Sequence, residues 1–241
     1  MEGRKISIFD AFVFAFRTTV DHIRLFVMVL LLGIALAIGA ASLAALFNID
    51  LIKDFRLVYP HLQQLQASIW IGPLRITTIR SLIPLISSHL ITLLIAAILF
   101  GLIFCSFDLG VRKIGLDLYD TDRSSAKVAF SYFYLAPRIM FAWLLYAIIV
   151  SIGLVLLIVP GLYWFLRFGF FPYFILEKNR SIIDSFRSSF ELTEGYVWDL
   201  FVLWIITRFI LHLGIMVWCG FFVTWPIALL SHVYVYRRLM A

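Results

Sequence analysis

Uncharged apolar stretches of about 20 residues recur along almost the whole chain. A helix of about that length is what the hydrocarbon core of a bilayer requires, because backbone polar groups can be satisfied there only within the helix itself. With 63% apolar and only 14% charged residues, the chain has too few polar side chains to cover a soluble globule of 241 residues. We therefore expect an all-α, polytopic membrane protein that forms a single membrane domain over residues 1–241.

The apolar stretches predict six transmembrane helices arranged as three hairpins. The third and fourth are expected to reverse at Val159-Pro160-Gly161, because proline cannot donate a helical hydrogen bond and glycine tolerates a sharp turn. The fourth is short and contains Arg167, so we expect neighbouring helices to shield it. The six predicted spans are 25–47, 85–107, 139–159, 161–176, 198–217 and 221–236.

The first span also has features of a signal-peptide core over residues 25–40. The preceding 24 residues are long and rich in phenylalanine, and the apolar run continues to Phe47. These features favour an uncleaved first span.

Lysine and arginine predict the orientation, because they accumulate on the cytoplasmic side of membrane proteins. Only four of them, all in the 48–84 connection, fall on the opposite side. We therefore expect both termini in the cytoplasm and anionic lipid headgroups as the counter-surface for the net charge of +6, with no nucleic-acid partner. The residues assigned to the cytoplasmic side are Arg4, Lys5, Arg17, Arg24, Arg112, Lys113, Arg123, Lys127, Arg138, Lys178, Arg180, Arg187, Arg237 and Arg238.

Three segments resemble one another and begin at Ser7, Ser124 and Ser181. Each carries an aromatic residue about five positions later and another four positions after that, and then enters a span after a Thr or Pro. We interpret them as three repeat units, at about 6–107, 124–176 and 181–236, each opening with a cytoplasmic interfacial helix. The alternative is that any helix entering a membrane shows this pattern. The paired aromatic residues are Phe12 and Phe16, Phe130 and Tyr134, and Phe186 and Phe190.

Two of these segments are clearly amphipathic. In the first, an apolar stripe of Phe9, Val13, Phe16 and Val20 opposes a polar stripe of Asp10, Arg17, Asp21 and Arg24. In the third, Ile183, Phe186 and Phe190 oppose Asp184, Arg187, Ser188, Glu191 and Glu194. We expect the 48–84 insertion of the first hairpin to lie on the outer surface, where it caps the bundle or recognises a partner.

The last hundred residues resemble the bacterial membrane-protein superfamily that includes the membrane domain of glycerophosphoryl diester phosphodiesterases. The resemblance covers about 80 residues and is carried by an ordered set of elements rather than by any single one. These elements are Pro160-Gly161, Arg167, Pro172, Glu177, Ser181, Ser188, Gly195, Thr224-Trp225-Pro226 and Tyr236-Arg237.

This resemblance implies a six-helix module of the bacterial inner membrane, in which Pro160, Gly161, Pro172, Thr224 and Pro226 are structural. The phosphodiesterase chemistry of that family resides in a separate soluble domain, which these 241 residues do not include. The resemblance therefore implies no catalytic residue.

Ionisable residues within predicted spans are the candidates for a functional site, because a charge at the bilayer centre is costly. Arg167, Arg208 and His212 lie within spans, and Glu177 lies at a span end. One interpretation is a polar pocket of these four residues, suited to an anionic substrate or lipid headgroup. The other is that both arginines extend to the membrane surface or pair with carboxylates or helix-terminal carbonyls.

No catalytic, cofactor or metal site is predicted. The sequence contains no HExxH, GxSxG, P-loop or GxGxxG motif, the histidines His61, His89 and His232 are isolated, and Cys105 and Cys219 form no CxxC pair. We therefore expect a non-enzymatic inner-membrane protein that supports membrane or envelope homeostasis or a partner's assembly, with membrane lipids and either a protein partner or a second copy as its partners. The alternative is a small transporter, channel or lipid-handling protein with an anion pocket between its helices.

Overall fold

The computed structural model describes residues 7–39, 42, 76–217 and 220–241. These residues are helical apart from their connections, and no strand occurs among them. The chain divides into two compact units, one of residues 1–32 with 102–241 (the larger unit) and one of residues 33–101 (the smaller unit). Most of the predicted 48–84 insertion lies outside the described residues.

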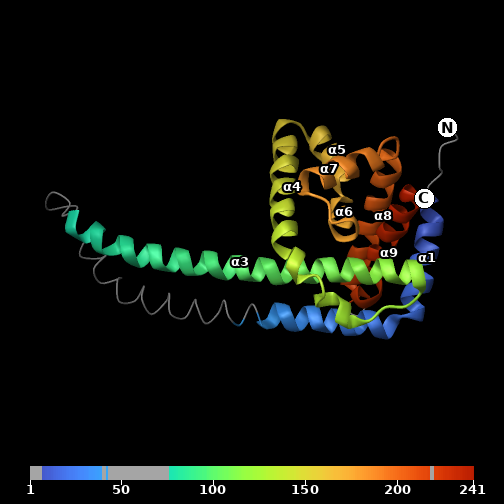
Figure 1. The fold of residues 1–241 in the computed structure, drawn as a ribbon, viewed down its shortest axis with the longest axis horizontal. Coiled ribbons are helices and arrows are strands. Elements are labelled where there is room, and N and C mark those ends of the chain that lie inside the picture. The colour runs from blue at the N-terminus through green and yellow to red at the C-terminus, as the bar shows by residue number, and fades with distance from the viewer. Residues whose placement is uncertain (1–6, 40–41, 43–75, 218–219) are drawn as a thin grey trace. The chain divides into compact units, whose positions relative to one another are not determined.

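The helices follow one another with short connections (Figure 1). Helix α1 spans Ile8–Asp21 and is followed, after a bend of 84°, by a helix over Ile23–Gly39. Helix α3 is continuous over Ile76–Thr121 and so extends well past the predicted span end at residue 107. The remaining elements are the 3-10 turns η1 (Ala126–Phe130) and η2 (Phe133–Leu135), α4 (Ala136–Leu156), α5 (Ile158–Phe168), α6 (Phe171–Lys178), α7 (Ile182–Leu192), α8 (Val197–Met216) and α9 (Phe221–Met240).

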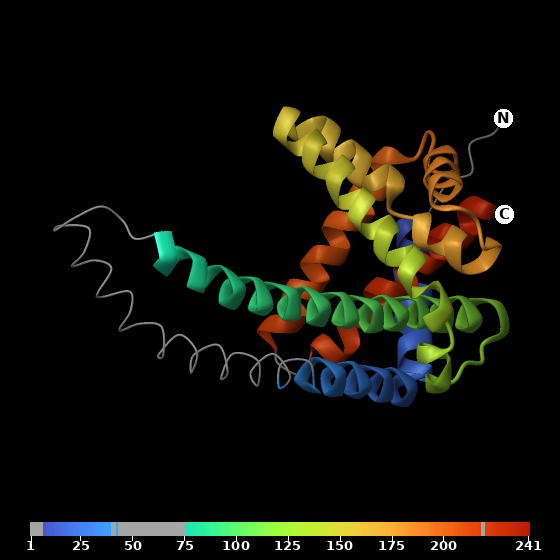
Figure 2. The same cartoon turned by 60° about the vertical axis from the view of Figure 1, so that its left-hand side comes forward.

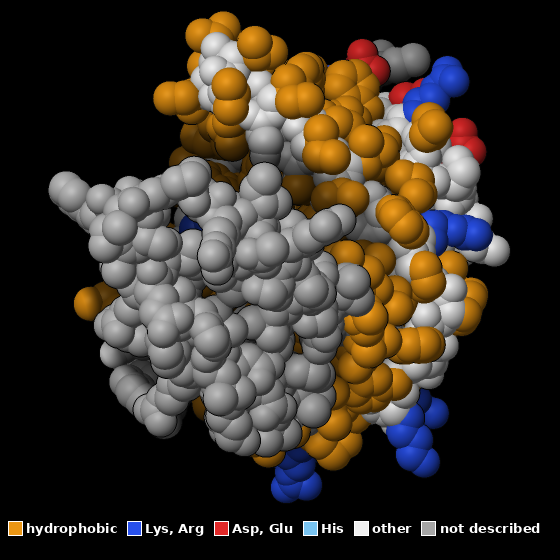
Figure 3. All heavy atoms as spheres, turned by 90° about the vertical axis from the view of Figure 1, so that its left-hand side faces the viewer, with side chains coloured by type: hydrophobic (Ala, Val, Ile, Leu, Met, Phe, Trp, Pro, Cys, Tyr) orange, Lys and Arg blue, Asp and Glu red, His pale blue; other side chains and the backbone are white. Residues whose placement is uncertain are grey.

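Three described helical segments are long and apolar enough to cross a membrane, and a fourth qualifies if α1 and Ile23–Gly39 count as one bent span. This confirms the all-helical, membrane-type part of the sequence prediction. The apolar stretch of Ile158–Lys178 is 50% buried, compared with 22% in Ala126–Leu156 and in Val197–Met216. On the face in Figure 3, hydrophobic side chains cover most of the visible described surface.

Serine caps begin all three amphipathic segments. The hydroxyls of Ser7 and Ser181 each accept a hydrogen bond of 3.2 Å from the backbone N–H three residues later, and Ser125 caps η1. This satisfies one of the N–H groups that the first turn of a helix leaves free. The middle segment is capped by Ser125 rather than Ser124 and forms short 3-10 turns instead of an α-helix, before Pro137 enters the first turn of α4.

Small side chains face the protein in the first and third segments. Ala11, Ala15 and Thr19 in α1 are fully buried, as are Ser185, Ser189 and Thr193 at the matching positions of α7 and its C-terminal cap. The spacing of four residues places each set on one helix face, which allows close approach to a neighbouring helix. In η1 the corresponding buried residue is Ala129.

The second and third amphipathic segments each pack against the second helix of the predicted hairpin before them, and the first packs against the last helix of the chain. Helix α7 packs against α5 and α6, and α1 packs against α9, the last helix of the chain. The η1 segment lies so close to α3 that a side chain at Gly110 would collide with the Ala129 backbone. The three contacts therefore form a closed series within the larger unit.

The predicted turn at Val159-Pro160-Gly161 is wrong by a few residues. The chain reverses at Leu157, whose extended backbone separates α4 from α5, and Pro160 and Gly161 lie inside α5. Proline is tolerated there because the N–H groups of the first helical turn have no partner to lose. Figures 1 and 2 show α4 and α5 side by side.

The role of Gly161 is close packing between α4 and α5. A side chain on Gly161 would lie 2.5 Å from the Leu154 backbone nitrogen, and one on Gly153 would lie 2.7 Å from the Gly161 Cα. The two glycines thus let the backbones of the hairpin touch.

We expect Gly161→Ala to destabilise the protein by about 1–3 kcal/mol, because the new methyl group overpacks a backbone contact that cannot move aside. Thermal unfolding of the detergent-solubilised protein measures the effect. Gly169→Ala is the matched control, since its side chain would approach only the carbonyl oxygens of the preceding turn, the nearer being that of Leu166 at 3.4 Å. Equal melting temperatures for the two variants would contradict this account of the hairpin.

Candidate functional site

Arg167 is buried in α5 and is held by α7. Only 5% of the residue is exposed. One guanidinium nitrogen donates to the Tyr163 hydroxyl at 2.6 Å and another donates to the Phe190 carbonyl, while the guanidinium carbon lies 3.6 Å from the centre of the Phe190 ring. A backbone carbonyl and an aromatic ring of the protein thus occupy positions around the guanidinium that a separate ligand would take.

The backbone around Arg167 is held by Ser189, which the sequence reasoning missed. The Ser189 hydroxyl donates to the Arg167 carbonyl at 2.8 Å and accepts from the Phe170 N–H at 3.1 Å, and Thr193 also donates to the Arg167 carbonyl. These bonds satisfy groups left open where α5 ends and α6 begins. The only sequence signal was the spacing of small residues in α7.

Phe186 and Phe190 do not form the exposed apolar stripe predicted for the third segment. Phe186 is buried and packs on Phe171, with ring centres 4.7 Å apart, and Phe190 covers Arg167. Of the predicted stripe only Ile183 is exposed. The prediction failed because α5 and α6 fold over this face, which a single helix does not reveal.

Glu177 belongs to a different cluster, at the ends of α3, α6 and α9. The Arg237 guanidinium contacts the Glu177 carboxylate and the Asp120 carboxylate, each at 2.5 Å, and the Tyr236 hydroxyl donates to Glu177 at 3.0 Å. We call these four residues the Arg237 cluster. Burial alone would lower the pKa of Arg237, but hydrogen bonding to Glu177, followed by its charge and that of Asp120, raises it.

The two carboxylates of the Arg237 cluster occupy matching places in the chain. Asp120 and Glu177 each lie two residues before a residue with positive φ, Asp122 at 55° and Asn179 at 47°. Each of these residues follows its helix in the left-handed conformation that commonly ends helices. One arginine from α9 therefore joins two equivalent helix ends.

Arg208 and His212 are exposed on α8 and belong to neither cluster. Arg208 lies 5.9 Å from the centre of the Trp204 ring, and a His212 ring nitrogen lies 2.7 Å from the Arg208 carbonyl oxygen. The four residues of the predicted polar pocket are thus distributed over separate places: Arg167 with α7, Glu177 with Arg237, and Arg208 with His212 on α8.

Aromatic side chains connect α4, α5 and α8 within the larger unit. A continuous series of ring contacts, with centres 5.4–6.3 Å apart, runs from Trp143 through Tyr146 and Phe165 to Trp204. Arg112, which pairs with Asp108 at 2.9 Å, lies 6.0 Å from the Trp143 ring centre and 5.4 Å from that of Tyr173. Aromatic rings thus lie against the partly buried Arg112–Asp108 ion pair.

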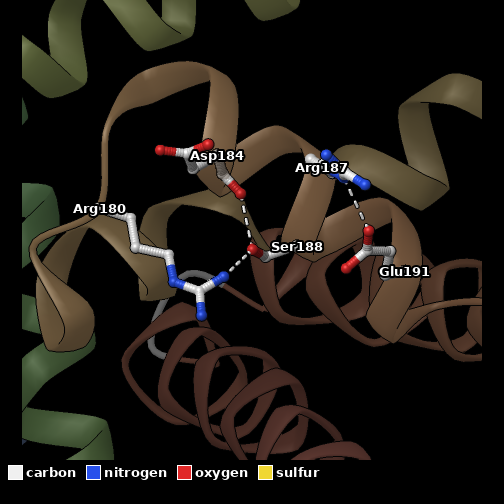
Figure 4. Close-up of a pocket in the computed structure, with 5 residues that line it drawn as sticks. All are labelled: Arg180, Asp184, Arg187, Ser188 and Glu191. Carbon is white, nitrogen blue, oxygen red and sulfur yellow. Dashed lines mark hydrogen bonds and ion pairs between the residues drawn. The ribbon is translucent and has the colours of Figure 1, made fainter.

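A surface pocket of about 450 Å³ lies beside α7 (Figure 4). The Arg180 guanidinium donates to the Ser188 hydroxyl, which in turn donates to the Asp184 carbonyl at 2.6 Å. Arg187 and Glu191 form an ion pair at 2.9 Å. The pocket therefore presents two cationic and two anionic side chains, of which only Arg187 and Glu191 form an ion pair among the described residues.

The described residues contain no group of three or more His, Cys, Asp or Glu side chains arranged to hold a metal ion. No known protein family, no characterised protein and no solved structure matches this chain. The resemblance to the phosphodiesterase membrane domain therefore stays a prediction that rests on the sequence elements alone.

We expect Arg237→Gln to lower the free energy of unfolding by about 1–2 kcal/mol, because it leaves the partly buried Glu177 carboxylate and the exposed Asp120 carboxylate without their cation, while solvent screens part of the loss. Arg238→Gln is the matched control, since the neighbouring arginine bonds only the Tyr234 hydroxyl among the described residues. Thermal unfolding of both variants in the same detergent provides the comparison. A melting temperature of Arg237→Gln no lower than that of Arg238→Gln would show that the cluster contributes no stability.

Proposed function

We propose that this chain is a non-enzymatic integral membrane protein with six spans, which supports membrane or envelope homeostasis or the assembly of a partner through amphipathic segments in the cytoplasmic leaflet. The bacterial inner membrane, with both termini in the cytoplasm, is the proposed location. Most of the Lys and Arg side chains visible in Figure 3 lie along the lower and right-hand edges of the described surface, which suits contact with anionic headgroups.

The exposed apolar stripe of α1 carries this proposal. Phe9, Val13, Phe16 and Val20 are each at least 50% exposed, although α1 packs against α9 through its small residues. The bend of 84° places α1 nearly perpendicular to Ile23–Gly39, the start of the proposed first span. If that helix crosses the bilayer, α1 lies along its surface with the stripe in the acyl region.

The aromatic centre supports a structural rather than a transporting role. A path for a polar solute would need a hydrated interior, whereas the series from Trp143 to Trp204 joins α4, α5 and α8 by direct ring contacts. Arg167, the ionisable residue expected to line such a path, is instead bonded to α7.

The proposed threefold repetition is supported by equivalent contacts between successive units. His22, just after α1, lies 3.9 Å from Asp122, and Arg138, at the start of α4, donates to Asn179 at 2.5 Å. Asp122 and Asn179 are the two left-handed residues that precede the second and third units. Parallel repeats related about an axis along the membrane normal would produce such matched contacts.

Spin labels on α1 test the interfacial placement. We expect a label at Phe16 to be more accessible to oxygen than to a water-soluble nickel complex in bilayers, and a label at Arg17 to show the reverse, because the two side chains face lipid and water respectively. Single-cysteine proteins lacking Cys105 and Cys219 serve for power-saturation spectroscopy. Matching nickel accessibility at both positions would place α1 in water and remove the proposal's main support.

Cysteine labelling tests the six-span topology. We expect cysteines at Arg123 and Lys178 to react with a membrane-impermeant maleimide only from the cytoplasmic side. Cysteines at Gln64 in the insertion, and at Val159 beside the α4–α5 reversal, should react only from the outside. Val159 is 78% exposed, so its reaction is not limited by burial. Labelling of all four positions from one face would rule out this topology.

A further inference from the structure

We propose that the pocket beside α7 binds a phosphate ester carrying a primary ammonium group, the chemistry of a phosphatidylethanolamine headgroup. The inference rests on the proposed function, which places α7 at the cytoplasmic surface of the membrane. The pocket is lined by Arg180, Asp184, Arg187, Ser188 and Glu191 and has a volume of about 450 Å³.

Arg180 is the phosphate-binding group. Its guanidinium is held by the buried Ser188 hydroxyl and by the Phe174 ring, whose centre lies 5.7 Å away. It forms no ion pair with a carboxylate of the described residues, and its side chain is exposed. A guanidinium fixed by one N–H retains others for phosphate oxygens, to which arginine binds in bidentate geometry.

Asp184 is the ammonium-binding group. One carboxylate oxygen accepts from the Ser181 hydroxyl at 2.6 Å, and no cation of the described residues pairs with Asp184. Arg187, the other cation in the pocket, is neutralised by Glu191 at 2.9 Å. Figure 4 shows Asp184 and Arg180 at the same end of the pocket without a bond between their charged groups.

The arrangement of charges selects a ligand with both signs. A purely anionic ligand at Arg180 would meet the negative charge of Asp184, whereas a ligand with phosphate and ammonium groups would satisfy both. A quaternary ammonium group cannot donate a hydrogen bond to Asp184, so phosphatidylcholine should bind less well than phosphatidylethanolamine. Ile183 is 75% exposed and lies four residues before Arg187, on the same helix face, where it can contact acyl chains.

Native mass spectrometry of the full chain with an equal mixture of phosphatidylethanolamine, phosphatidylcholine and phosphatidylglycerol tests the proposal. We expect the ethanolamine lipid to be retained about tenfold more than the other two, as one well-placed charge-assisted hydrogen bond provides. Competition by soluble glycerophosphoethanolamine distinguishes the two sources of this chemistry. Displacement of the lipid at equal concentration assigns the pocket to the soluble ester, and continued retention assigns it to the lipid; either supports the proposed chemistry.

The variants separate the two halves of the site. Asp184→Asn keeps the size of the side chain and should remove the preference for phosphatidylethanolamine over phosphatidylglycerol. Arg180→Gln should weaken retention of phosphatidylethanolamine and of phosphatidylglycerol about tenfold. Arg180→Lys keeps the positive charge and serves as the alternative variant if Arg180→Gln lowers the melting temperature. It should retain the preference for phosphatidylethanolamine. Lys178→Gln, the matched control, removes an equal charge two residues before Arg180 and should change nothing. Equal retention of the three lipids by the unaltered protein, or an unchanged preference in Asp184→Asn, would overturn the proposal while leaving the spin-label result on α1 unaffected.

Discussion

The ion pairs of Arg237 are the constraint on which the arrangement of the larger unit depends. This arginine lies near the end of the last helix and contacts Asp120 at the end of α3 and Glu177 at the end of α6. The two carboxylates precede the second and third amphipathic segments, so one guanidinium holds the points at which these segments leave their helices. A fork of N–H donors suits this role better than a single ammonium group, because it can bind two carboxylates at once.

The first and third amphipathic segments, α1 and α7, both pack against the protein through small residues, but they differ in which of their remaining side chains are exposed. In α1 the small face of Ala11, Ala15 and Thr19 lies against the protein, and the large apolar residues are exposed. Such exposure would be unfavourable in water, and it is what a bilayer stabilises. In α7 the matching small face is made of serine and threonine, and Ser189 satisfies the backbone at the break between α5 and α6. The serine and threonine face of α7 therefore stabilises the helix break between α5 and α6.

Sequence reasoning identified helices and where they begin better than contacts. Ser7 and Ser181 begin α1 and α7 as their positions predicted, because a helix cap depends on residues only three positions apart. The reversal between α4 and α5 was placed at Pro160 and lies at Leu157, because proline is equally acceptable in a first helical turn. The predicted pocket of Arg167, Arg208, His212 and Glu177 does not assemble. Arg167 and Glu177 find partners on different helices distant in the sequence, whereas the contacts of Arg208 and His212 lie within α8.

The sequence by itself determined that the described chain is helical and contains segments apolar enough to cross a membrane, since both properties depend on local composition and periodicity. It also determined the amphipathic character of α1, because the spacing of apolar residues within one helix is enough to create an apolar face. Only the tertiary structure decided that Phe186 and Phe190 face inward, that Ser189 bonds the Arg167 backbone, and that Arg237 joins Asp120 and Glu177. These contacts link residues separated by up to 117 positions, and no local pattern specifies which polar groups will meet when the helices pack.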